Sequence, residues 1–218
     1  MDEGVFITVE GIEGSGKSTQ GRLLADYLRG TGLPVTETRE PGGTAIGETI
    51  RRILLSPSSN EISTETELLL ILACRADHVA RVIKPALERG EVVISDRYAD
   101  ATFAYQGFGR KVRLERIRGL NEVATGGLLP DLTLILDLDV DTGLARVEER
   151  SVHGDTDRFE RETLEFHRRV REGYREVASR EPDRVKVVDA DDDIEAVHER
   201  ILAIVTEFLE TKLGVRDN

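Results

Sequence analysis

The chain has 218 residues, enough for a full core in one domain, and its 42 Asp and Glu residues outnumber 30 Lys and Arg residues. The formal net charge of −12 argues against a nucleic-acid groove or an anionic membrane surface, so an anionic ligand needs a local cluster of cations. The single cysteine, Cys74, excludes an intrachain disulfide, and no apolar stretch approaches the roughly 20 residues of a membrane span. We therefore expect a cytoplasmic protein whose one domain covers residues 1–218.

The first predicted strand and helix flank a glycine-rich loop. Residues 5–9 read Val-Phe-Ile-Thr-Val, which is typical of a buried strand, and an amphipathic helical pattern begins at Thr19. Between them, residues 11–18 read Gly-Ile-Glu-Gly-Ser-Gly-Lys-Ser, a complete G-x-x-x-x-G-K-[ST] motif. The motif and its flanking elements predict a phosphate-binding loop for a nucleotide.

The chemistry of such a loop assigns a role to each of its parts. Backbone N–H groups and the helix N-terminus point at phosphate oxygens. Lys17 reaches the β- and γ-phosphates, and the Ser18 hydroxyl is placed to ligate Mg²⁺. The residues expected to bind the nucleotide are Gly11, Ile12, Glu13, Gly14, Ser15, Gly16, Lys17, Ser18 and Thr19.

Four further apolar runs, at residues 35–39, 92–96, 132–138 and 185–189, are predicted strands that alternate with longer helical patterns. This alternation predicts βαβ units and an α/β fold with a parallel sheet. Apolar stripes at residues 164–177 and 194–208 predict two helices in the last third of the chain. His167 lies in the first of these stripes, so we interpret it as a helix-face residue and not as a ligand.

One helix is predicted between the second and third strands. Thr64-x-x-Glu67 indicates a capping box at its start, and Gly90 stands where its C-cap belongs. Cys74 lies in this apolar segment, which favours a buried packing role. The predicted apolar stripe of the helix is Leu69, Leu72, Ala73, Ala76, Ala80 and Ile83.

The third predicted strand ends in Ser-Asp-Arg at residues 95–97, which brings a carboxylate and a guanidinium to the edge where α/β folds bind ligands. Asp96 is suited to hold Mg²⁺ directly or through water and Arg97 to grip an acceptor phosphate, although a structural pair would look the same. No guanine-reading [NT]-K-x-D segment follows residues 132–139, which disfavours a GTPase. An arginine after Asp96, instead of a second carboxylate, disfavours motor and transport ATPases.

The polar segment at residues 148–162 has two open interpretations. It is either a solvated turn or a mobile lid that closes over the nucleotide and supplies arginine side chains to the transferring group. His153, Asp155 and Asp157 within it match no metal-binding spacing, so a solvated loop is the better interpretation of these three residues.

Six segments together resemble the thymidylate kinases, and the resemblance extends over nearly the whole chain. It implies transfer of the ATP γ-phosphoryl group to dTMP with Mg²⁺, giving dTDP for dTTP synthesis. It also implies a P-loop NTPase fold of three α/β/α layers with a five-stranded parallel sheet and a short lid, usually in a homodimer. The segments are Val-Glu-Gly-Ile-Glu-Gly-Ser-Gly-Lys-Ser (9–18), Thr-Arg-Glu-Pro-Gly-Gly-Thr (38–44), Ile-Lys-Pro-Ala-Leu (83–87), Asp-Arg-Tyr (96–98), Ala-Tyr-Gln-Gly (104–107) and Leu-Pro-Asp-Leu-Thr (129–133).

The same resemblance implies how dTMP would be bound. Arg75 bonds the thymine edge, while Thr102 and Gln106 face the base. Glu13 approaches the sugar 3′-hydroxyl, and Tyr105 packs on the deoxyribose and leaves no room for a 2′-hydroxyl. The residues expected around the monophosphate are Arg39 or Glu40, Arg51 and Arg97.

Two features distinguish this chain within the resemblance. Residues 12–15 hold no arginine, although some relatives carry one there, so the lid would supply that cation from Arg150 or Arg158, with Arg146 as an outside choice. Ile71 stands where many relatives have a phenylalanine that stacks on thymine. Either Ile71 covers the base, or it is a core residue and another side chain such as Phe103 covers the base.

Two other functions are alternatives to an active dTMP kinase. One is a kinase for another nucleotide or a deoxynucleoside, and the other is a nucleotide-binding regulator without turnover. Loss of Lys17, Arg97 or the lid arginines would favour the regulator, and all of them are present. The sequence therefore favours catalysis, with Lys17, Arg97, Arg150 and Arg158 acting on the phosphates.

Overall fold

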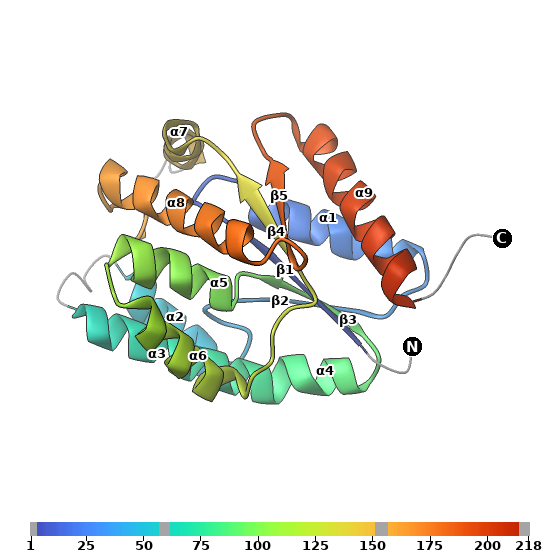
Figure 1. Ribbon diagram of the computed structural model, residues 1–218, viewed down its shortest axis with the longest axis horizontal. Coiled ribbons are helices and arrows are strands. Elements are labelled where there is room, and N and C mark those ends of the chain that lie inside the picture. Colours follow the sequence, from blue (N-terminus) through green and yellow to red (C-terminus); the bar gives the residue numbers. More distant parts are fainter. Residues whose placement is uncertain (1–3, 57–61, 151–156, 214–218) are drawn as a thin grey trace.

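Five parallel strands form one sheet in the order β2-β3-β1-β4-β5. The computed structural model describes residues 4–56, 62–150 and 157–213, and Figure 1 shows the sheet enclosed by helices. The strands are β1 (Val5–Gly11), β2 (Val35–Arg39), β3 (Val92–Asp96), β4 (Leu132–Asp137) and β5 (Val185–Asp189). The five predicted strands and the α/β class are confirmed, although β1 continues to Gly11 and β4 ends at Asp137.

The strands are connected by helices. Two π-helical segments interrupt the α-helices, one between α3 and α4 and one after α5. The sequence predicted one helix between β2 and β3, whereas the chain also forms α2, which is capped by the Thr44 side chain. The helical elements are α1 (Lys17–Gly30), α2 (Ala45–Leu55), α3 (Thr64–His78), η1 (Val79–Ile83), α4 (Lys84–Glu88), α5 (Ala99–Thr102), η2 (Phe103–Gly109), α6 (Leu114–Thr125), α7 (Val140–Arg150), α8 (Leu164–Arg180) and α9 (Ile194–Leu213).

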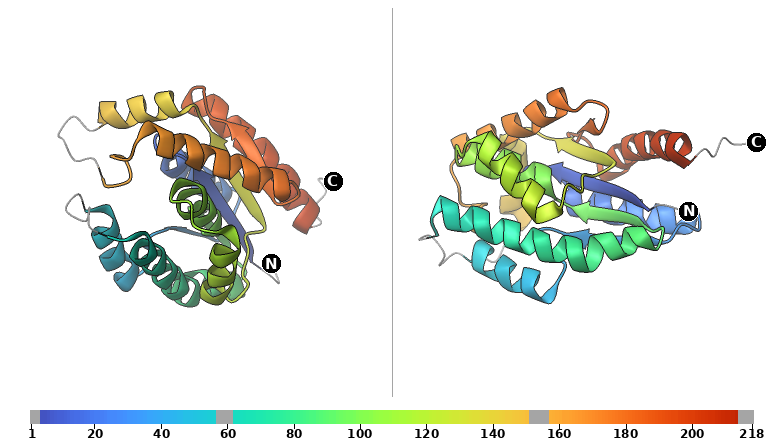
Figure 2. Two further views of the ribbon diagram at one scale, coloured as in Figure 1. Left: turned by 60° about the vertical axis from the view of Figure 1, so that its left-hand side comes forward. Right: turned by 60° about the horizontal axis from the view of Figure 1, so that its bottom comes forward.

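Helices cover both faces of the sheet, as Figures 1 and 2 show. A Cβ added to Gly21 of α1 would lie 4.0 Å from the side chains of Val9 and Ile94, which places α1 on the face that carries them. On the opposite face Phe6 packs edge-to-face against Tyr98, with 4.9 Å between ring centroids. The α/β/α layers implied by the resemblance are therefore present, and the apolar runs of β1, β3 and β4 follow from burial on both faces.

The start of α3 differs from the prediction. Ser63 is the N-cap, because its side chain accepts a hydrogen bond from the N–H of Thr66, and Thr64 is already the first helical residue. Glu67 makes no capping contact because it is buried, with 1 % of its surface exposed. The predicted capping box is wrong because Ser63, one residue earlier, supplies the side-chain oxygen that caps the helix. The prediction for Gly90 is confirmed, since it follows α4 with a positive φ of 74°.

The buried face of α3 also differs from the predicted stripe. Leu69 is 55 % exposed, and Ala73 and Ala76 are exposed as well. The buried positions of α3 are Glu67, Leu68, Leu72, Cys74, Arg75 and His78. The prediction fails because half of this buried face is polar, and an apolar pattern does not detect polar side chains that find partners inside the fold.

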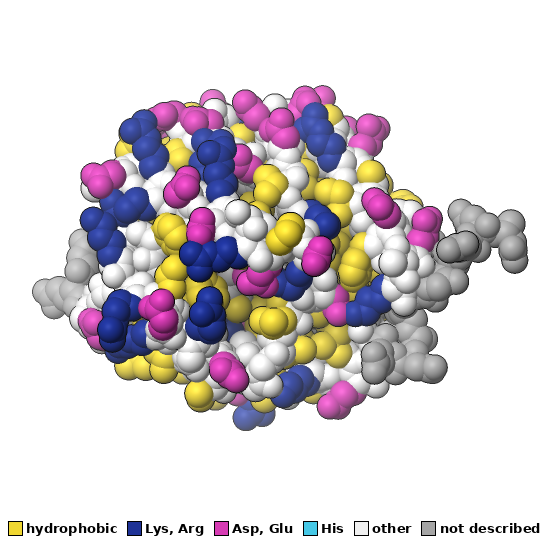
Figure 3. Space-filling model, viewed as in Figure 1, with side chains coloured by type: hydrophobic (Ala, Val, Ile, Leu, Met, Phe, Trp, Pro, Cys, Tyr) yellow, Lys and Arg dark blue, Asp and Glu magenta, His cyan; other side chains and the backbone are white. Residues whose placement is uncertain are grey.

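Three further observations concern burial, the surface and the hydropathy of the helices. Cys74 is buried, as predicted, and burial raises the pKa of its thiol to about 11, which suits a packing role. On the face shown in Figure 3, basic and acidic side chains are interspersed with apolar ones. Among the described helices, none combines the length and apolar character that would carry it across a bilayer.

Candidate active site

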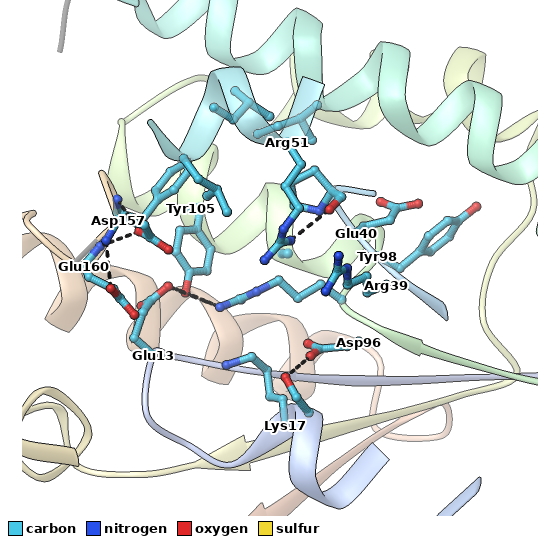
Figure 4. Close-up of a pocket in the computed structure, with 18 of the residues that line it drawn as sticks. Glu13, Lys17, Arg39, Glu40, Arg51, Asp96, Tyr98, Tyr105, Asp157 and Glu160 are labelled. Carbon is cyan, nitrogen blue, oxygen red and sulfur yellow. Dashed lines mark hydrogen bonds and ion pairs between the residues drawn. The ribbon is translucent and has the colours of Figure 1, made fainter. Parts of the chain in front are cut away.

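A pocket of about 310 Å³ opens at the carboxyl edge of the sheet, where the phosphate-binding loop meets the end of β3 (Figure 4). It brings together most of the residues predicted from sequence, while Gly11, Ile12, Ser15 and Arg158 do not line it. The predicted residues that do line it are Glu13, Gly14, Gly16, Lys17, Ser18, Thr19, Arg39, Glu40, Arg51, Ile71, Arg75, Asp96, Arg97, Thr102, Tyr105, Gln106 and Arg150.

The glycines of the loop are required by its backbone. Gly14 has a φ of 74°, and a Cβ there would lie 2.1 Å from the carbonyl oxygen of Gly143 in α7. Gly16, with a φ of 89°, is the N-cap of α1. Only glycine adopts these conformations without cost, so the loop turns sharply and presents its N–H groups at the start of α1.

Lys17 folds back over the loop. Its Nζ donates to the carbonyl oxygen of Ile12 at 2.6 Å and to Ser15 Oγ at 3.4 Å. Burial and the nearby Arg97 charge lower the pKa of Lys17 to about 8, against the opposite effect of Asp96. Among the described residues, no carboxylate forms an ion pair with this ammonium, which is held where the phosphates of a nucleotide would approach.

Ser18 and Asp96 form the part of the site suited to Mg²⁺. The Ser18 hydroxyl donates a hydrogen bond to Asp96 Oδ2. In the described part of the chain, no group of three or more His, Cys, Asp or Glu residues is arranged to hold a metal ion. Magnesium commonly uses one or two protein oxygens together with substrate phosphates and water, so this pair of oxygens fits that ion.

Arg97 lines the pocket and has a positive φ of 75°. Its guanidinium donates to the Gly11 carbonyl at 3.0 Å, to the hydroxyls of Tyr174 and Tyr105 at 2.9 Å each, and to Glu13 at 3.2 Å. These four bonds hold the side chain in one orientation, with 17 % of it exposed. The cation is thus positioned before any ligand binds.

Glu13 is held from several sides, as Figure 4 shows. The Tyr105 hydroxyl donates to its Oε1 at 2.6 Å, and Nδ1 of His167 lies 3.3 Å from its Oε2. Burial by itself would raise the pKa of Glu13, but His167, Arg97 and Lys17 lower it to about 2. The His167 contact does not reach hydrogen-bond geometry, so the charges of Arg97 and Lys17 are the main cause of the lowered pKa. His167 is therefore a buried residue of α8 behind Glu13, which agrees with its interpretation as a helix-face residue.

Glu10 is a buried acidic residue that sequence reasoning missed. Its Oε1 accepts from the N–H groups of Tyr98 and Ala101, and its Oε2 accepts from the Tyr174 hydroxyl at 2.8 Å. Burial, together with the charge of Asp100, raises the pKa of Glu10 to about 7. The available signal was a charged residue at the end of an apolar strand, directly before the glycine-rich loop.

Arg75 is 1 % exposed and uses its guanidinium within the protein. It donates to Glu40 Oε2, Thr102 Oγ1 and the Tyr98 carbonyl, each at 2.8 Å, and also to Asn121. Glu40 also contacts the His78 ring at 2.9 Å. The predicted base-binding residues Arg75 and Thr102 are thus brought together at the pocket wall by a buried polar network.

Arg39, the last residue of β2, and Arg51, on α2, both line the pocket. Arg39 pairs with Glu48 at 3.1 Å and is about half exposed, while Arg51 donates to the carbonyl of Pro41 at 2.9 Å. Burial and the Arg39 charge lower the pKa of Arg51. The two guanidinium groups place positive charge at the pocket wall, where an anion would be stabilised.

The aromatic ring on the lid side of the pocket is Phe159, which the sequence analysis did not select. Phe159 lines the pocket and packs edge-to-face on Tyr105, with 5.8 Å between centroids. Ile71 also lines the pocket, whereas Phe103 packs against the main core cluster. Ile71 packs against the cluster of Ile50, Leu54 and Cys74 as well, but of the two side chains named for the base it is the one that lines the pocket.

The predicted lid is described at both of its ends. Arg150 lines the pocket from the end of α7, whereas Arg146 points to the carbonyl of Ala190. Arg158 is 8 % exposed, donates to the Leu54 carbonyl at 2.9 Å and lies 2.7 Å from Glu67. The Arg158 side chain therefore contacts other protein groups and does not line the pocket. His153 and Asp155 lie outside the described residues.

Two acidic residues of the same segment line the pocket, which the sequence analysis did not foresee. Asp157 and Glu160 both belong to its wall and are labelled in Figure 4. Asp157 Oδ1 accepts from the N–H groups of Phe159 and Glu160, at 2.8 and 3.0 Å. Asp157 is half-buried, and its carboxylate caps a turn that places both acidic residues at the pocket wall.

Comparisons with known proteins agree on one family. The family model described as thymidylate kinase matches residues 9–201. Thymidylate kinase from Syntrophotalea carbinolica is 50 % identical over 213 residues, covering 96 % of this chain and 99 % of the relative. Its counterpart from Pseudomonas putida strain GB-1 is 50 % identical over 211 residues, covering 97 % and 99 %. The crystal structure of thymidylate kinase from Ehrlichia chaffeensis matches with a TM-score of 0.76 and 35 % identity, covering 94 % of this chain and 99 % of that one.

Proposed function

The chain belongs to the thymidylate kinase family, and from this premise we propose that it transfers the γ-phosphoryl group of ATP to dTMP, giving dTDP and ADP for dTTP synthesis. One observation carries the proposal. A phosphate-binding loop with Lys17 and a second group of cations, Arg39, Arg51 and Arg97, line the same pocket. Such a pocket suits two phosphorylated ligands that meet end to end.

We propose that the donor nucleotide binds at the loop. N–H groups of the loop and the start of α1 face its phosphates, with Lys17 at the β- and γ-positions. Ser18 and Asp96 would hold Mg²⁺, which supplies positive charge to the phosphate oxygens when bound. The hydrogen bond between these two side chains keeps both oxygens at one place.

The acceptor needs no general base. A phosphate monoester has a second pKa near ~6, so its oxygens are largely ionised at neutral pH and are already nucleophiles. The main task is to bring two anions into line and to neutralise their charge. Arg97, held by four internal hydrogen bonds, is the cation we propose for the acceptor phosphate, with Arg39 and Arg51 at its flank.

We propose that the nucleoside of dTMP lies between η2 and α3. Arg75, Thr102 and Gln106 are the residues for the base edge, and Ile71 is the residue for its face. Glu13 and Tyr105, joined by a hydrogen bond of 2.6 Å, are the residues for the deoxyribose. The support is that all of these side chains line one pocket beside the cations.

The lid is proposed to act on the transferring group. Arg150 already lines the pocket and is the first candidate for the transition-state cation. Arg158 would have to leave Glu67 to take that role.

We also propose a homodimer and a cytoplasmic location. The support for a dimer is the exposed stripe on α3, in which Leu69 is 55 % exposed beside the exposed alanines. Leu69→Glu should convert the dimer to monomer, which light scattering coupled to gel filtration would measure.

The support for a cytoplasmic location is Cys74, because a buried free thiol suits a reducing compartment.

A coupled assay that records ADP tests the proposed function. It uses ATP and Mg²⁺ against a panel of nucleoside monophosphates, with Lys17→Ala as the inactive control. Turnover fastest with dTMP supports the proposal. Preference for another monophosphate would support the alternative kinase, and nucleotide binding without turnover would support the regulator.

A further inference from the structure

We propose that Glu67 is a positioning residue for base selection, which orients the amide of Gln106 so that its oxygen faces the pocket. The inference rests on the proposed function. It goes further by assigning to the base site a requirement for a hydrogen-bond donor on the ligand. Glu67 lies outside the pocket lining and therefore acts through Gln106, which is part of that lining.

The contact between the two side chains is buried. Glu67 on α3 and Gln106 on η2 are each 1 % exposed. Nε2 of Gln106 donates to Oε1 of Glu67 at 2.8 Å. In the absence of water, a polar side chain keeps the partner that the protein provides, so this contact determines the orientation of the amide.

Two arginines define the chemistry of Glu67. Arg110 donates to both carboxylate oxygens, at 3.2 and 3.1 Å, and Arg158 lies 2.7 Å from Oε2. A carboxylate between two guanidinium groups offers acceptor atoms only. The reversed amide would place the Gln106 oxygen against a carboxylate oxygen with no proton between them. The amide nitrogen of Gln106 therefore faces Glu67, because only this orientation places a donor opposite the carboxylate.

This orientation leaves Oε1 of Gln106 as the atom for a ligand. Among the described residues, none donates a hydrogen bond to that oxygen. A base that turns an N–H toward it gains a hydrogen bond, and a base that turns an unprotonated ring nitrogen toward it leaves two acceptors unpaired. Thymine has a proton on N3 and cytosine has none. The site should therefore distinguish the two bases at N3, and Glu67 should set the sign of that preference.

The same carboxylate links base selection to the lid segment. Arg158 belongs to the segment at residues 157–162, in which Asp157 and Phe159 line the pocket. Arg110 joins Glu67 to Glu162 of this segment, with 2.6 Å to the Glu162 carboxylate. Glu162 thus shares Arg110 with Glu67, and among the described residues no hydrogen bond joins it to Gln106, which makes it a matched control.

The first experiment uses the unmodified protein. Calorimetry compares dTMP with 5-methyl-dCMP, which keeps the 5-methyl group and differs at N3 and C4, and with N3-methyl-dTMP, which blocks the N3 donor. We expect both analogues to bind at least about 100-fold more weakly than dTMP, as for sites built around a ligand N–H. Equal affinity for dTMP and N3-methyl-dTMP would overturn the inference.

The second experiment uses variants and measures the ratio of kcat/KM for dTMP to kcat/KM for 5-methyl-dCMP. In Glu67→Gln this ratio should fall at least about tenfold, because the new amide accepts either orientation of Gln106. Glu162→Gln should leave it unchanged. Gln106→Leu should lower the ratio as well, and adding Glu67→Gln to that variant should lower it no further.

Two results separate positioning from structure. If Glu67→Gln lowers kcat/KM for both nucleotides equally, Glu67 has only a structural role and the inference fails. Glu67→Asp keeps the counter-charge for both arginines and draws the carboxylate away from Gln106, so it supplies a folded variant in which the ratio should still fall. If no monophosphate is phosphorylated, the proposed function fails. If dTMP is phosphorylated and the ratio is unmoved in Glu67→Asp, only this inference fails.

Discussion

The Ser18 hydroxyl at the start of α1 donates a hydrogen bond to Asp96 at the end of β3. These residues are far apart in the sequence, and β1 and β3 pair in parallel register so that Val9 lies beside Asp96. The register therefore brings a hydroxyl and a carboxylate to one point at the edge of the sheet. An oxygen pair of this kind can hold a magnesium ion that a nucleotide brings with it.

Asp96→Asn should raise the Mg²⁺ concentration needed for half-maximal activity by about 10- to 100-fold, because a neutral amide binds a hard cation less well. Titration of kcat with Mg²⁺ at saturating ATP measures this effect. Asp131→Asn, on the loop before β4, is the control for loss of one acidic charge. An unchanged Mg²⁺ dependence in Asp96→Asn would remove Asp96 from the metal site.

Lys17→Ala and Arg97→Ala should each lower turnover by about 10³-fold or more, since cations on a transferring phosphoryl group contribute on this scale. Arg97→Ala should also weaken dTMP binding, while Lys17→Ala should act through ATP. Steady-state kinetics with circular dichroism to verify folding would check both. The exposed Arg116→Ala serves as the control, and near-normal turnover in either folded site variant would contradict the assigned roles.

Arg150→Ala should lower kcat more than it raises KM, because a cation that engages the transferring group on closure contributes mainly in the transition state. Arg158→Ala should instead lower the free energy of unfolding by about 3 kcal/mol, at the low end for breaking a buried ion pair because Arg110 remains with Glu67. Kinetics and urea unfolding on both variants separate the two roles. Wild-type kcat in the double variant would place the transition-state cation elsewhere.

Ile71→Phe should tighten dTMP binding, since a ring at the pocket wall adds base stacking of roughly 1–3 kcal/mol. Ile71→Ala should weaken it by uncovering the base. Overpacking is the competing result, in which Ile71→Phe costs about 1–3 kcal/mol of stability and affinity is unchanged. Calorimetry and thermal unfolding on both variants decide. Unchanged affinity in Ile71→Ala, with lower stability, would show that Ile71 belongs to the core alone.

Glu10 predicts a pH dependence of stability. Burial first, and then Asp100, raises its pKa from the ordinary 4.5 to about 7. The folded state therefore holds a proton that the unfolded state has lost, and this contribution is complete below about pH 4.5 and disappears as the pH rises through about 7. Relative to Glu10→Gln, which cannot ionise, the unmodified protein should lose about 2.5 kcal/mol of unfolding free energy between pH 5 and pH 8. Urea unfolding of both proteins at these two pH values measures the difference, and a constant difference would contradict the raised pKa.

The phosphate loop and the strands were predictable because their determinants are local. Glycines at fixed spacing, and apolar runs of strand length, need no distant partner to be recognised. The buried face of α3 was not predictable in this way. Arg75 is buried because Glu40 and Thr102, from other parts of the chain, accept its hydrogen bonds. The apolar pattern of the sequence instead selected the neighbouring face of α3, which includes the exposed Leu69.

The acidic residues of the site divide along the same line. Asp96 ends an apolar strand, so its position at the edge of the sheet was predictable. Asp157 and Glu160 lie in a charged stretch, where nothing in the sequence distinguishes a carboxylate at the pocket from one in solvent. Their place follows from Arg158, whose partners Leu54 and Glu67 lie about a hundred residues earlier and hold the segment against the pocket.

The left-handed backbone conformation of Arg97 links the stability of the fold to the chemistry of the pocket. A non-glycine residue in that conformation costs of order 1–3 kcal/mol, and glycine would remove the cost. The guanidinium offsets part of that cost through its four internal hydrogen bonds, all of which a glycine variant would lose. Relieving the backbone here would also discard a cation of the pocket, so heat-resistant versions of this enzyme have to gain their stability at other positions.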